Sequence, residues 1–382
     1  MSQSLKQKAE ELLSLAGVKL NGTMPHDIQI HDSEVYRRVF SQGSLGLGES
    51  YVDGLWDCKK LDEFFFHILK ANLDNKIKKS SLIIHILKAK FNNRQRKSKA
   101  FEIGEKHYDL GNDLYKAMLD KRMTYTCGYW KNAKDLEEAQ EAKLDLVCKK
   151  LNLKKGDKVL DIGCGWGSFL KFAAEKYGIK GVGITVSKEQ VSLAQKLCKR
   201  LPIEIRLQDY KDLLKSHEKF DYIVSLGMFE HVGYKNYKTF FSVVNNVLKE
   251  NGLFLLHTIG SNKPVTNTEP WISKYIFPNS MLPSISQISK YSEDLFVMED
   301  WHNFGADYDK TLMTWFKNFN KNWPELKLKT NKNRERKYDE RFYRMWKYYL
   351  LSCAGLFRAR KSQLWQIVFS RNGVKGGYES VR

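Results

Sequence analysis

The sequence predicts an α/β protein in which a small helical domain precedes a doubly wound domain with a mostly parallel sheet. Three observations support this fold class. In the second part of the chain, short apolar strands alternate with helical stretches of about 10 to 15 residues, as in parallel-sheet α/β proteins. A glycine-rich turn directly follows the first of these strands. Before the strands begin, apolar residues recur with helical spacing.

The composition is that of a basic globular chain. Its 382 residues contain 64 Lys and Arg against 44 Asp and Glu, a net charge of +20, and 42% hydrophobic residues with only 7 prolines argue against disorder. The charged residues within 1–17 interrupt any signal-peptide core, and the longest apolar runs, such as 82–87, fall far below the roughly 18 residues that cross a bilayer. The six cysteines include no C-x-x-C pair, so neither a metal site nor a disulfide framework is predicted. These features predict a cytoplasmic protein that contacts membranes only at their surface.

Residues 1–91 are predicted to form the helical domain. Its first helix is expected to end at Gly17, and the apolar face of that helix consists of Leu5, Ala9, Leu12, Leu13 and Ala16. Between 76 and 99 lie nine Lys or Arg and no acidic residue. The polar part of this basic stretch predicts a linker at 92–104, followed by the α/β domain at 105–382.

The α/β domain is predicted to contain seven strands. Ser187 and Gln190 offer a capping box for the helix after the second strand. A further helix is expected from about Lys310, before the last strand. The strands are expected at 158–162, 182–185, 203–207, 222–226, 253–259, 296–301 and 365–370.

The turn after the first strand carries the clearest motif. Residues 159–167 read VLDIGCGWG, which has the spacing D-x-G-x-G-x-G from Asp161 onward. Glycines at these positions let a ligand approach the backbone beside a helix N-terminus. The dinucleotide fingerprint G-x-G-x-x-G is excluded because position 168 is Ser. The motif instead resembles the first motif of class I methyltransferases, which bind S-adenosylmethionine.

Further motifs narrow this resemblance to the cyclopropane fatty acid synthases. The second strand is followed by hydroxyls and an amide, at Thr185, Ser187 and Gln190, where methyltransferases in general place an acidic residue. The matching segments are 107–112, 125–130, 208–210, 228–233, 256–260, 275–284 and 300–309. Residues 43–51 extend the match into the N-terminal domain, so the chain resembles the longer bacterial enzymes that modify phospholipids.

The resemblance implies a reaction on an isolated cis double bond of a membrane phospholipid acyl chain. The double bond attacks the sulfonium methyl of S-adenosylmethionine, and the resulting carbocation loses a proton and closes to a cyclopropane ring. The cation must be sheltered from water, and a base must reach the added methyl. In this family the base is a bound bicarbonate ion.

The residues that match the bicarbonate-binding set of the family come from distant parts of the chain. They are Cys127, Glu230, His257, Ile259 and Tyr308. A carboxylate beside an anion requires a shared proton, so we expect Glu230 either to orient His257 or to accept the bicarbonate hydroxyl. Among the many aromatic residues near the motifs, only Tyr308 is assigned a further role, the stabilisation of the cation.

The resemblance also assigns the residues that hold the methyl donor. Gly163, Gly165 and Gly167 are expected to face its methionine part, with Asp161 in the same turn. The ribose is assigned to Thr185, Ser187 and Gln190, and the adenine to Asp209 and Tyr210 beside Gln208. Tyr125 and Thr126 are expected to close over the donor. The chain departs from the family in two places: Thr126 stands where Ser is frequent, and Ser280 where Gly is often found.

Cys353 lies in another motif of the family and is retained as a catalytic candidate. The alternative is a packed small hydrophobe, because methylation of an alkene needs no covalent enzyme intermediate.

The basic charge suits either nucleic acid or anionic lipid. Apolar residues interleaved with lysines at 78–91 resemble a helix in a membrane interface, and no RNA-binding signature is present. We therefore expect an anionic phospholipid bilayer as partner, on the inner leaflet of the cytoplasmic membrane, an unsaturated acyl chain as substrate, and no nucleic acid. The alternative for this stretch is a cationic face that is exposed to solvent and does not bind a membrane.

The N-terminal domain leaves three roles open: membrane docking, control of acyl access, or contacts in a homodimer. Two alternative activities also remain: a lipid methyltransferase that forms an unclosed methyl branch, and an RNA methyltransferase or inactive RNA-binding relative.

Overall fold

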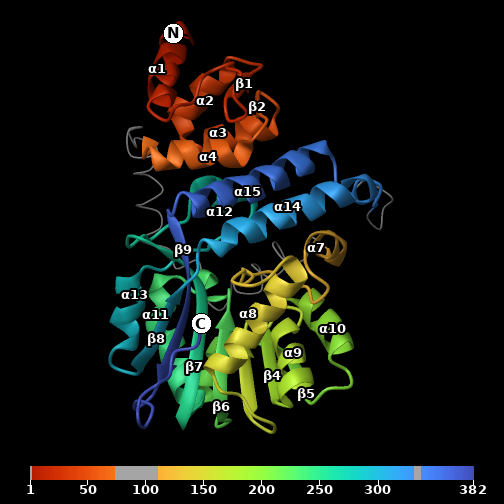
Figure 1. Ribbon diagram of the computed structural model, residues 1–382, viewed down its shortest axis with the longest axis vertical. Helices are drawn as coiled ribbons and strands as arrows, with labels where there is room; N and C mark the ends of the chain where they lie inside the picture. Colours follow the sequence, from red (N-terminus) through yellow and green to blue (C-terminus); the bar gives the residue numbers. More distant parts are fainter. Residues whose placement is uncertain (1, 74–110, 331–336) are drawn as a thin grey trace. The chain divides into compact units, whose positions relative to one another are not determined.

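The computed structural model describes residues 2–73, 111–330 and 337–382 (Figure 1). The predicted linker at 92–104 and the basic apolar stretch at 78–91 lie outside these ranges. Contacts divide the chain into two compact units, and each is described by itself. Unit 1 comprises 1–92, 267–278 and 308–362, and unit 2 comprises 93–266, 279–307 and 363–382.

Unit 2 contains the predicted seven-stranded sheet. Its order is β5-β4-β3-β6-β7-β9-β8, so the strand order reverses between β3 and β6. The pairs β3/β4, β4/β5, β3/β6 and β6/β7 are parallel, whereas β8 and β9 are antiparallel. Ligands of doubly wound folds bind at such a reversal, beyond the carboxyl ends of the strands. The strands are β3 (Lys158–Ile162), β4 (Lys180–Thr185), β5 (Ile203–Leu207), β6 (Phe220–Leu226), β7 (Leu248–Ser261), β8 (Val297–Asn303) and β9 (Ser362–Ser370).

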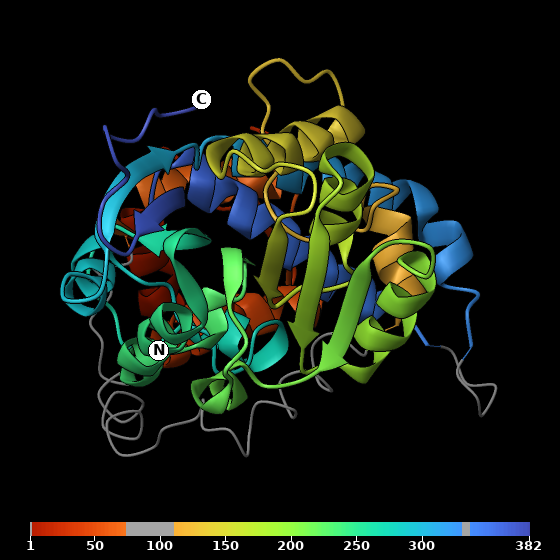
Figure 2. The same cartoon turned by 90° about the horizontal axis from the view of Figure 1, so that it is seen from below.

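Helices cover both faces of this sheet, as Figures 1 and 2 show. One apolar core joins the sheet to α8 (Leu136–Lys150), α9 (Ser168–Tyr177) and α10 (Lys188–Leu197). The other joins it to α11 (Tyr237–Val247) and α13 (Ile285–Ser292). Burial on both faces explains why the central strands are continuous apolar runs. A short helix, α7 (Asn112–Met118), and three 3₁₀ turns, η3 (Tyr210–Lys215), η4 (Phe229–His231) and η5 (Tyr234–Asn236), complete the described elements of this unit.

The start of α10 agrees in part with the predicted capping box. The Ser187 side chain accepts a hydrogen bond from the Gln190 N–H, as expected for an N-cap. The Ser187 N–H, however, is directed to the Thr185 hydroxyl at 3.3 Å, and Gln190 Oε1 accepts a hydrogen bond from the same hydroxyl at 2.7 Å. The end of β4 and the start of α10 therefore form one connected polar group.

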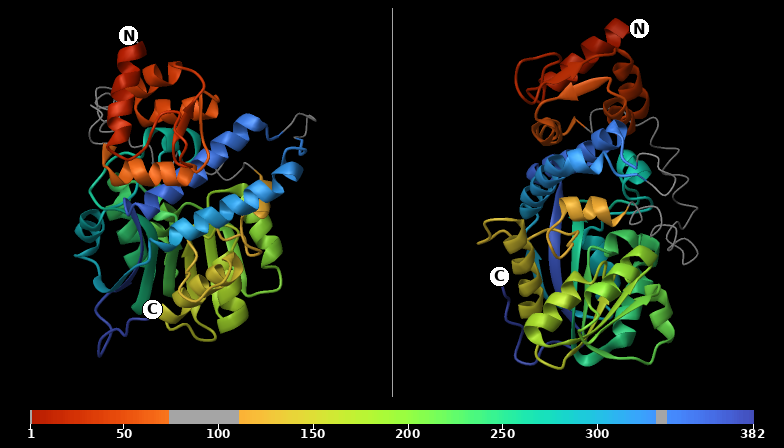
Figure 3. Two further views of the ribbon diagram at one scale, coloured as in Figure 1. Left: turned by 45° about the horizontal axis from the view of Figure 1, so that its top comes forward. Right: turned by 90° about the vertical axis from the view of Figure 1, so that its right-hand side faces the viewer.

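Unit 1 contains helices from the N-terminal and the C-terminal parts of the chain. The first part supplies α1 (Ser2–Ser14), α2 (Glu34–Gln42), α3 (Ser44–Val52) and α4 (Leu61–Lys70). The second supplies α12 (Pro270–Tyr275), α15 (Glu340–Arg358) and nearly all of α14 (Asp307–Leu326). Figure 3 shows α14 and α15 running side by side. The rings of Phe319 on α14 and Tyr343 on α15 stack with centroids 5.6 Å apart, a separation typical of aromatic pairs.

Two features of unit 1 differ from the sequence-based expectation. The N-terminal residues include a small antiparallel sheet of β1 (Ile28–Ile30) and β2 (Trp56–Cys58), in which Ile30 pairs with Trp56. The compact unit also extends beyond 1–91, because α4 packs on α15. The Phe65 and Tyr348 rings meet edge to face at 5.2 Å. Such long-range contacts leave no mark in local composition. No helix in the described ranges is long and apolar enough to cross a membrane.

Candidate active site

The glycine-rich turn after β3 lies at the carboxyl edge of the sheet. Gly163 and Gly165 have φ of +87° and +55°, a region that favours glycine. The Gly163 and Cys164 N–H groups both donate to the Ile184 carbonyl at the end of β4, at 2.9 and 3.0 Å. A Cβ on Gly163 would lie 2.5 Å from the Met228 Cβ. The turn is therefore both strained and closely packed, and only glycine fits at 163.

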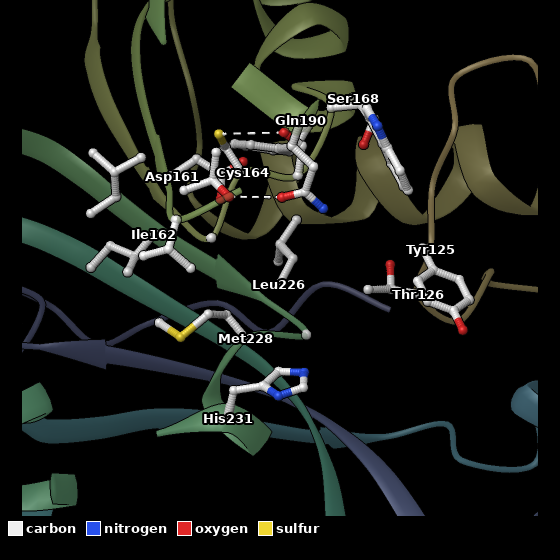
Figure 4. Close-up of a pocket in the computed structure, with 18 of the residues that line it drawn as sticks. Tyr125, Thr126, Asp161, Ile162, Cys164, Ser168, Gln190, Leu226, Met228 and His231 are labelled. Carbon is white, nitrogen blue, oxygen red and sulfur yellow. Dashed lines mark hydrogen bonds between the residues drawn. The ribbon is translucent and has the colours of Figure 1, made fainter. Parts of the chain in front are cut away.

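Beside this turn is a pocket with a volume of about 150 Å³. Figure 4 shows Asp161 and Cys164 on one side, Met228 and His231 on the opposite side, and Tyr125 with Thr126 apart from both. Ten of the twelve predicted donor-binding residues line it: Tyr125, Thr126, Asp161, Gly163, Gly165, Thr185, Gln190, Gln208, Asp209 and Tyr210.

The two remaining predicted residues are not part of the lining. Gly167 precedes α9 with φ of +80°, and its position is packed against the Cys198 sulfur, which a Cβ would approach to 3.2 Å. Ser187 caps α10, as described above. Both therefore hold the walls of the pocket in place, while their roles toward a donor stay a prediction.

Two buried carboxylates lie in the pocket wall. Asp161 is buried, its Oδ1 has no hydrogen-bond partner, and burial raises its pKa to about 7. Asp209 is also buried and accepts a hydrogen bond from the Lys211 N–H at 2.8 Å, where it caps η3. An unpartnered buried carboxylate oxygen is costly, so Asp161 is suited to a ligand that carries a donor or a positive charge.

Lys143 is a pocket residue that the sequence analysis missed. It lies on α8, is fully buried, and donates from Nζ to the Thr126 hydroxyl at 2.7 Å. Burial lowers its pKa to about 8, opposed by the nearby charges of Asp120 and Asp161. Helical periodicity could have indicated that Lys143 is buried, because Lys143 and Lys150 lie on the buried face of α8 together with Val147.

Glu230 and the end of β7 form a second polar cluster. In sequence, Glu230 lies between the pocket-lining residues Met228 and His231. Glu230 Oε1 accepts a hydrogen bond from the Ile259 N–H at 2.7 Å, whereas its Oε2 is buried without a partner. Burial raises the pKa of Glu230 to about 7, against the opposing effect of the Ile259 N–H. The Gly227 N–H donates to the His257 carbonyl, which attaches this cluster to the pocket-lining segment.

His257 supplies the second unpartnered atom of this cluster. Its Nδ1 faces the Gln366 Nε2 at 3.3 Å, and with the amide placed this way Nδ1 is the acceptor and Nε2 carries the hydrogen. Nε2 is buried without a partner, and burial holds the pKa of His257 well below its usual value. The imidazole is therefore neutral, with one N–H available. The Phe304 ring lies 5.9 Å from the imidazole and 5.3 Å from the Tyr129 ring.

Of the five residues assigned to the anion, Glu230 and Ile259 are in direct contact, and His257 lies two residues before Ile259 on β7. Cys127 lies in the same unit, fully buried, and its thiol is directed to the Gly128 carbonyl at 3.2 Å. Tyr308 belongs to unit 1, where its ring packs on Phe357 with centroids 4.5 Å apart.

Cys353 also belongs to unit 1, on α15. Its thiol is protonated at neutral pH because burial raises its pKa to about 12. It lines an apolar cavity of unit 1 and is not part of the pocket beside the glycine turn. Its participation in catalysis stays a prediction.

The departure at Ser280 has a structural explanation. The left-handed residue of this loop is Asn279, with φ of +63°, whereas Ser280 does not have positive φ. Asparagine tolerates this region better than other non-glycine residues. The next residue, Met281, donates its N–H to the Glu230 carbonyl at 2.7 Å. The loop therefore supports the backbone of Glu230 without needing glycine at 280.

Comparison with known proteins agrees with this geometry. Residues 95–367 match the family described as mycolic acid cyclopropane synthetase. The chain belongs to this cyclopropane synthase family. It is 53% identical to the cyclopropane-fatty-acyl-phospholipid synthase of Escherichia coli K12, over 98% of this chain and 95% of that protein. It is 34% identical to a probable fatty acid methyltransferase of Pseudomonas putida, over 72% of this chain and 70% of that one.

A solved structure supports the same assignment. The mycolic acid cyclopropane synthase CmaA1, complexed with SAH and CTAB, superposes with a TM-score of 0.62 at 32% identity, covering 70% of this chain and 97% of that one. As a cyclopropane synthase family member with the class I methyltransferase fold, the protein is an S-adenosylmethionine-dependent methyltransferase. The fold class inferred from the glycine motif is thereby confirmed.

Proposed function

We propose that this enzyme transfers a methylene group from S-adenosylmethionine to the cis double bond of unsaturated acyl chains in membrane phospholipids, forming a cyclopropane ring. The observation that carries the proposal is the buried pair of unpartnered atoms, Glu230 Oε2 and His257 Nε2, on segments that adjoin the donor pocket. A general methyltransferase has no need for a second buried polar cluster of this kind. The similarity to the cyclopropane-fatty-acyl-phospholipid synthase of E. coli supports the substrate class.

The pocket residues fit the methyl donor. Asp161 offers an unpartnered carboxylate oxygen to a cationic or N–H group, and the turn at Gly163 and Gly165 lets the ligand reach the backbone. Thr185 and Gln190 present hydroxyl and amide groups to ribose hydroxyls. When bound, S-adenosylmethionine supplies an electrophilic methyl group on a sulfonium.

The Glu230 cluster fits bicarbonate, which has one hydroxyl donor and oxygen acceptors. Deprotonated Glu230 Oε2 accepts from a hydroxyl, and the His257 Nε2–H donates to an oxygen, so the two atoms complement both ends of such an ion. When bound, bicarbonate supplies a base for the proton that must leave the added methyl. Of the alternatives left open above, this arrangement favours Glu230 as an acceptor, while its Oε1 remains bonded to the Ile259 N–H.

The aromatic rings near the cluster and the neutral His257 affect the access of water and the local charge. The Phe304 ring packs against His257, and the Tyr129 ring packs on Phe304; such aromatic packing excludes water from a reactive cation. Burial keeps His257 neutral, so it cannot add a second positive charge beside that cation.

Membrane association at the inner leaflet of the cytoplasmic membrane completes the proposal. The net charge of +20 favours adsorption to anionic lipid, at about 1 kcal/mol per engaged basic residue. This docking is reversible and peripheral, and a homodimer is its expected oligomeric state. Nucleic acid is not expected as a partner.

A second candidate is an unclosed methyl branch on the same acyl chain. The match to a probable fatty acid methyltransferase favours it. The two products share one early reaction and differ in where the proton is lost, so the anion cluster decides between them.

The test is mass spectrometry of the full chain incubated with S-adenosylmethionine, bicarbonate and vesicles of dioleoyl-phosphatidylglycerol. We expect lipid heavier by one methylene, with a ring resolved from a branched alkene by gas chromatography. Omission of bicarbonate should lower the rate. A product lacking the ring would establish the branch activity, and no product from folded protein that binds S-adenosylmethionine would overturn both.

A further inference from the structure

Unit 1 contains a cavity that shares no lining residue with the donor pocket. Its volume is about 460 Å³, against about 150 Å³ for the donor pocket. The walls come from six helices, α1, α2, α3, α4, α12 and α15, together with residues between them. Cavities of several hundred Å³ are typical of sites that bury most of a small ligand. The size alone makes this cavity a candidate site.

The chemistry of the lining is almost entirely apolar. Aliphatic and aromatic side chains from all six helices line the space, and many of them, such as Leu13, Val39 and Leu356, are only half-buried. No lysine, arginine or histidine is among the described lining residues. The one carboxylate, Glu269, already caps α12 by accepting from the Ile272 N–H at 2.8 Å. A ligand here must be apolar along its length, since a polar one would leave its groups unpaired.

Close packing around the cavity prevents its collapse. A Cβ on Gly355 of α15 would lie 2.6 Å from the Asp62 carbonyl of α4. A Cβ on Gly48 of α3 would lie 2.4 Å from the Trp271 ring of α12. These helices already touch through glycine and cannot approach further, so the hollow between them persists.

Ion pairs hold the same helices at this spacing. Arg358 of α15 binds Asp62 and Glu63 of α4 at 2.8 and 2.6 Å, and Asp309 of α14 at 2.9 Å. Glu49 of α3 accepts from the Tyr275 hydroxyl of α12 at 2.9 Å. An apolar hollow with a rigid frame forfeits dispersion contacts and holds no hydrogen-bonded water, so filling it with apolar atoms is favourable.

We propose that this cavity binds the alkyl chain of a lipid, at a site distinct from the donor pocket. An alkyl chain is apolar along its length, flexible enough to follow an irregular space, and needs no polar partner in the wall. The choice of an alkyl chain over other apolar ligands rests on the proposed lipid substrate. A free fatty acid and one chain of a phospholipid share this chemistry.

The first test is photolabelling of the full chain without S-adenosylmethionine. Two probes carry a diazirine on a saturated chain: palmitic acid, and dipalmitoyl-phosphatidylglycerol in vesicles. We expect label on peptides from α2 and α15, and the probe that labels them identifies the source of the chain. Label confined to peptides of unit 2 would overturn the proposal.

Cavity-filling variants make the test specific. Leu356→Trp and Val39→Trp each place a large ring in the hollow, and each should lower labelling of unit 1 at least fivefold. Leu328→Trp is the matched control, because the Leu328 side chain is 71% exposed on the same unit. Folded filling variants that label like the parent would contradict the site.

Cys353 gives a measurement on the unaltered protein. It is half-buried in the cavity wall, whereas the other five cysteines of the chain are buried. Palmitic acid should slow its modification by methyl methanethiosulfonate several-fold, and an unchanged rate would count against occupancy. None of these readouts requires turnover, so failure to form a cyclopropane would overturn the proposed function and leave this result standing.

Discussion

The donor pocket and the apolar cavity of unit 1 are built in opposite ways. The donor pocket is lined by backbone turns, carboxylates and hydroxyls at the ends of neighbouring parallel strands. The unit 1 cavity is lined by apolar side chains from helices at both ends of the chain. In the first, short motifs carry the chemistry, and in the second, packing between distant segments creates the space.

This contrast shows which substitutions each region tolerates. In the donor pocket, single polar atoms and single glycines matter, because each one meets the ligand or fixes the turn. In unit 1, the frame of ion pairs and close helix contacts matters, and individual lining residues can exchange for others of similar volume. Substitutions in each region can test that difference.

Glu230→Gln should lower turnover on the order of a hundredfold, as loss of a group in acid–base catalysis commonly does. Affinity for S-adenosylmethionine, measured by calorimetry, should not change. Glu250→Gln, at an exposed position of the same unit, is the control. Turnover near that of the parent would remove Glu230 from the anion site.

The pH profile should report the same carboxyl. Because the pKa of Glu230 is about 7, Oε2 is protonated below that pH and cannot accept from a bicarbonate hydroxyl, so the rate should rise with pH through about 7. Bicarbonate titrates in a similar range. The pH profile of the residual activity of Glu230→Gln shows the part that comes from bicarbonate alone. An identical profile in parent and variant would contradict the assignment of the titration to Glu230.

Gly163→Ala should weaken binding of S-adenosylmethionine on the order of tenfold or more. Its Cβ would meet Met228 in the pocket wall, and overpacking of this kind costs about 1–3 kcal/mol. Gly156→Ala is a matched control with φ of +94° and no atom within 4 Å. The control should lose stability through backbone strain alone and keep its affinity.

Lys143→Met should weaken donor binding about tenfold, because a hydrogen bond from a charged group contributes about 1.5–3 kcal/mol and Thr126 would lose its partner. Lys150→Met removes another buried lysine of α8, which pairs with Asp300 at 3.2 Å and does not line the pocket. That variant should change the free energy of unfolding and leave the dissociation constant unaltered. If both variants weakened donor binding equally, Lys143 would have only a structural role.

Arg358→Met should have the smallest effect on the donor pocket, although it should lower the free energy of unfolding by about 3 kcal/mol, because the buried Asp62 carboxylate would lose its cation. Chemical denaturation of the full chain would measure it. Donor affinity should stay the same, because no residue of this network lines the donor pocket. A loss of donor affinity would mean that the two regions are energetically coupled.

Much of unit 2 could be predicted because its signals are local. The strands at 158–162 and 203–207 have the predicted bounds. The first is a mostly apolar, buried run, and the second alternates apolar and charged residues at the edge of the sheet, and both are local patterns. The glycine turn was predicted from its local D-x-G-x-G-x-G spacing, whereas the donor-binding residues were assigned by the family resemblance, and ten of those twelve line the pocket. Lys143 was missed because its contact with Thr126, 17 residues earlier in the chain, forms only once the loop that carries Thr126 has folded against α8.

Periodicity, glycine positions and short motifs were enough to predict the fold class and the family from the amino-acid sequence, whereas the residues assigned to the donor stay a prediction. Only the tertiary structure decided that β1 and β2 pair, that α4 joins α15 in one unit, and that Ile259 gives its N–H to Glu230. It also decided that Cys353 lines an apolar cavity. The physical reason is that packing and hydrogen bonding act between residues that meet only after folding, and such pairings have no local pattern.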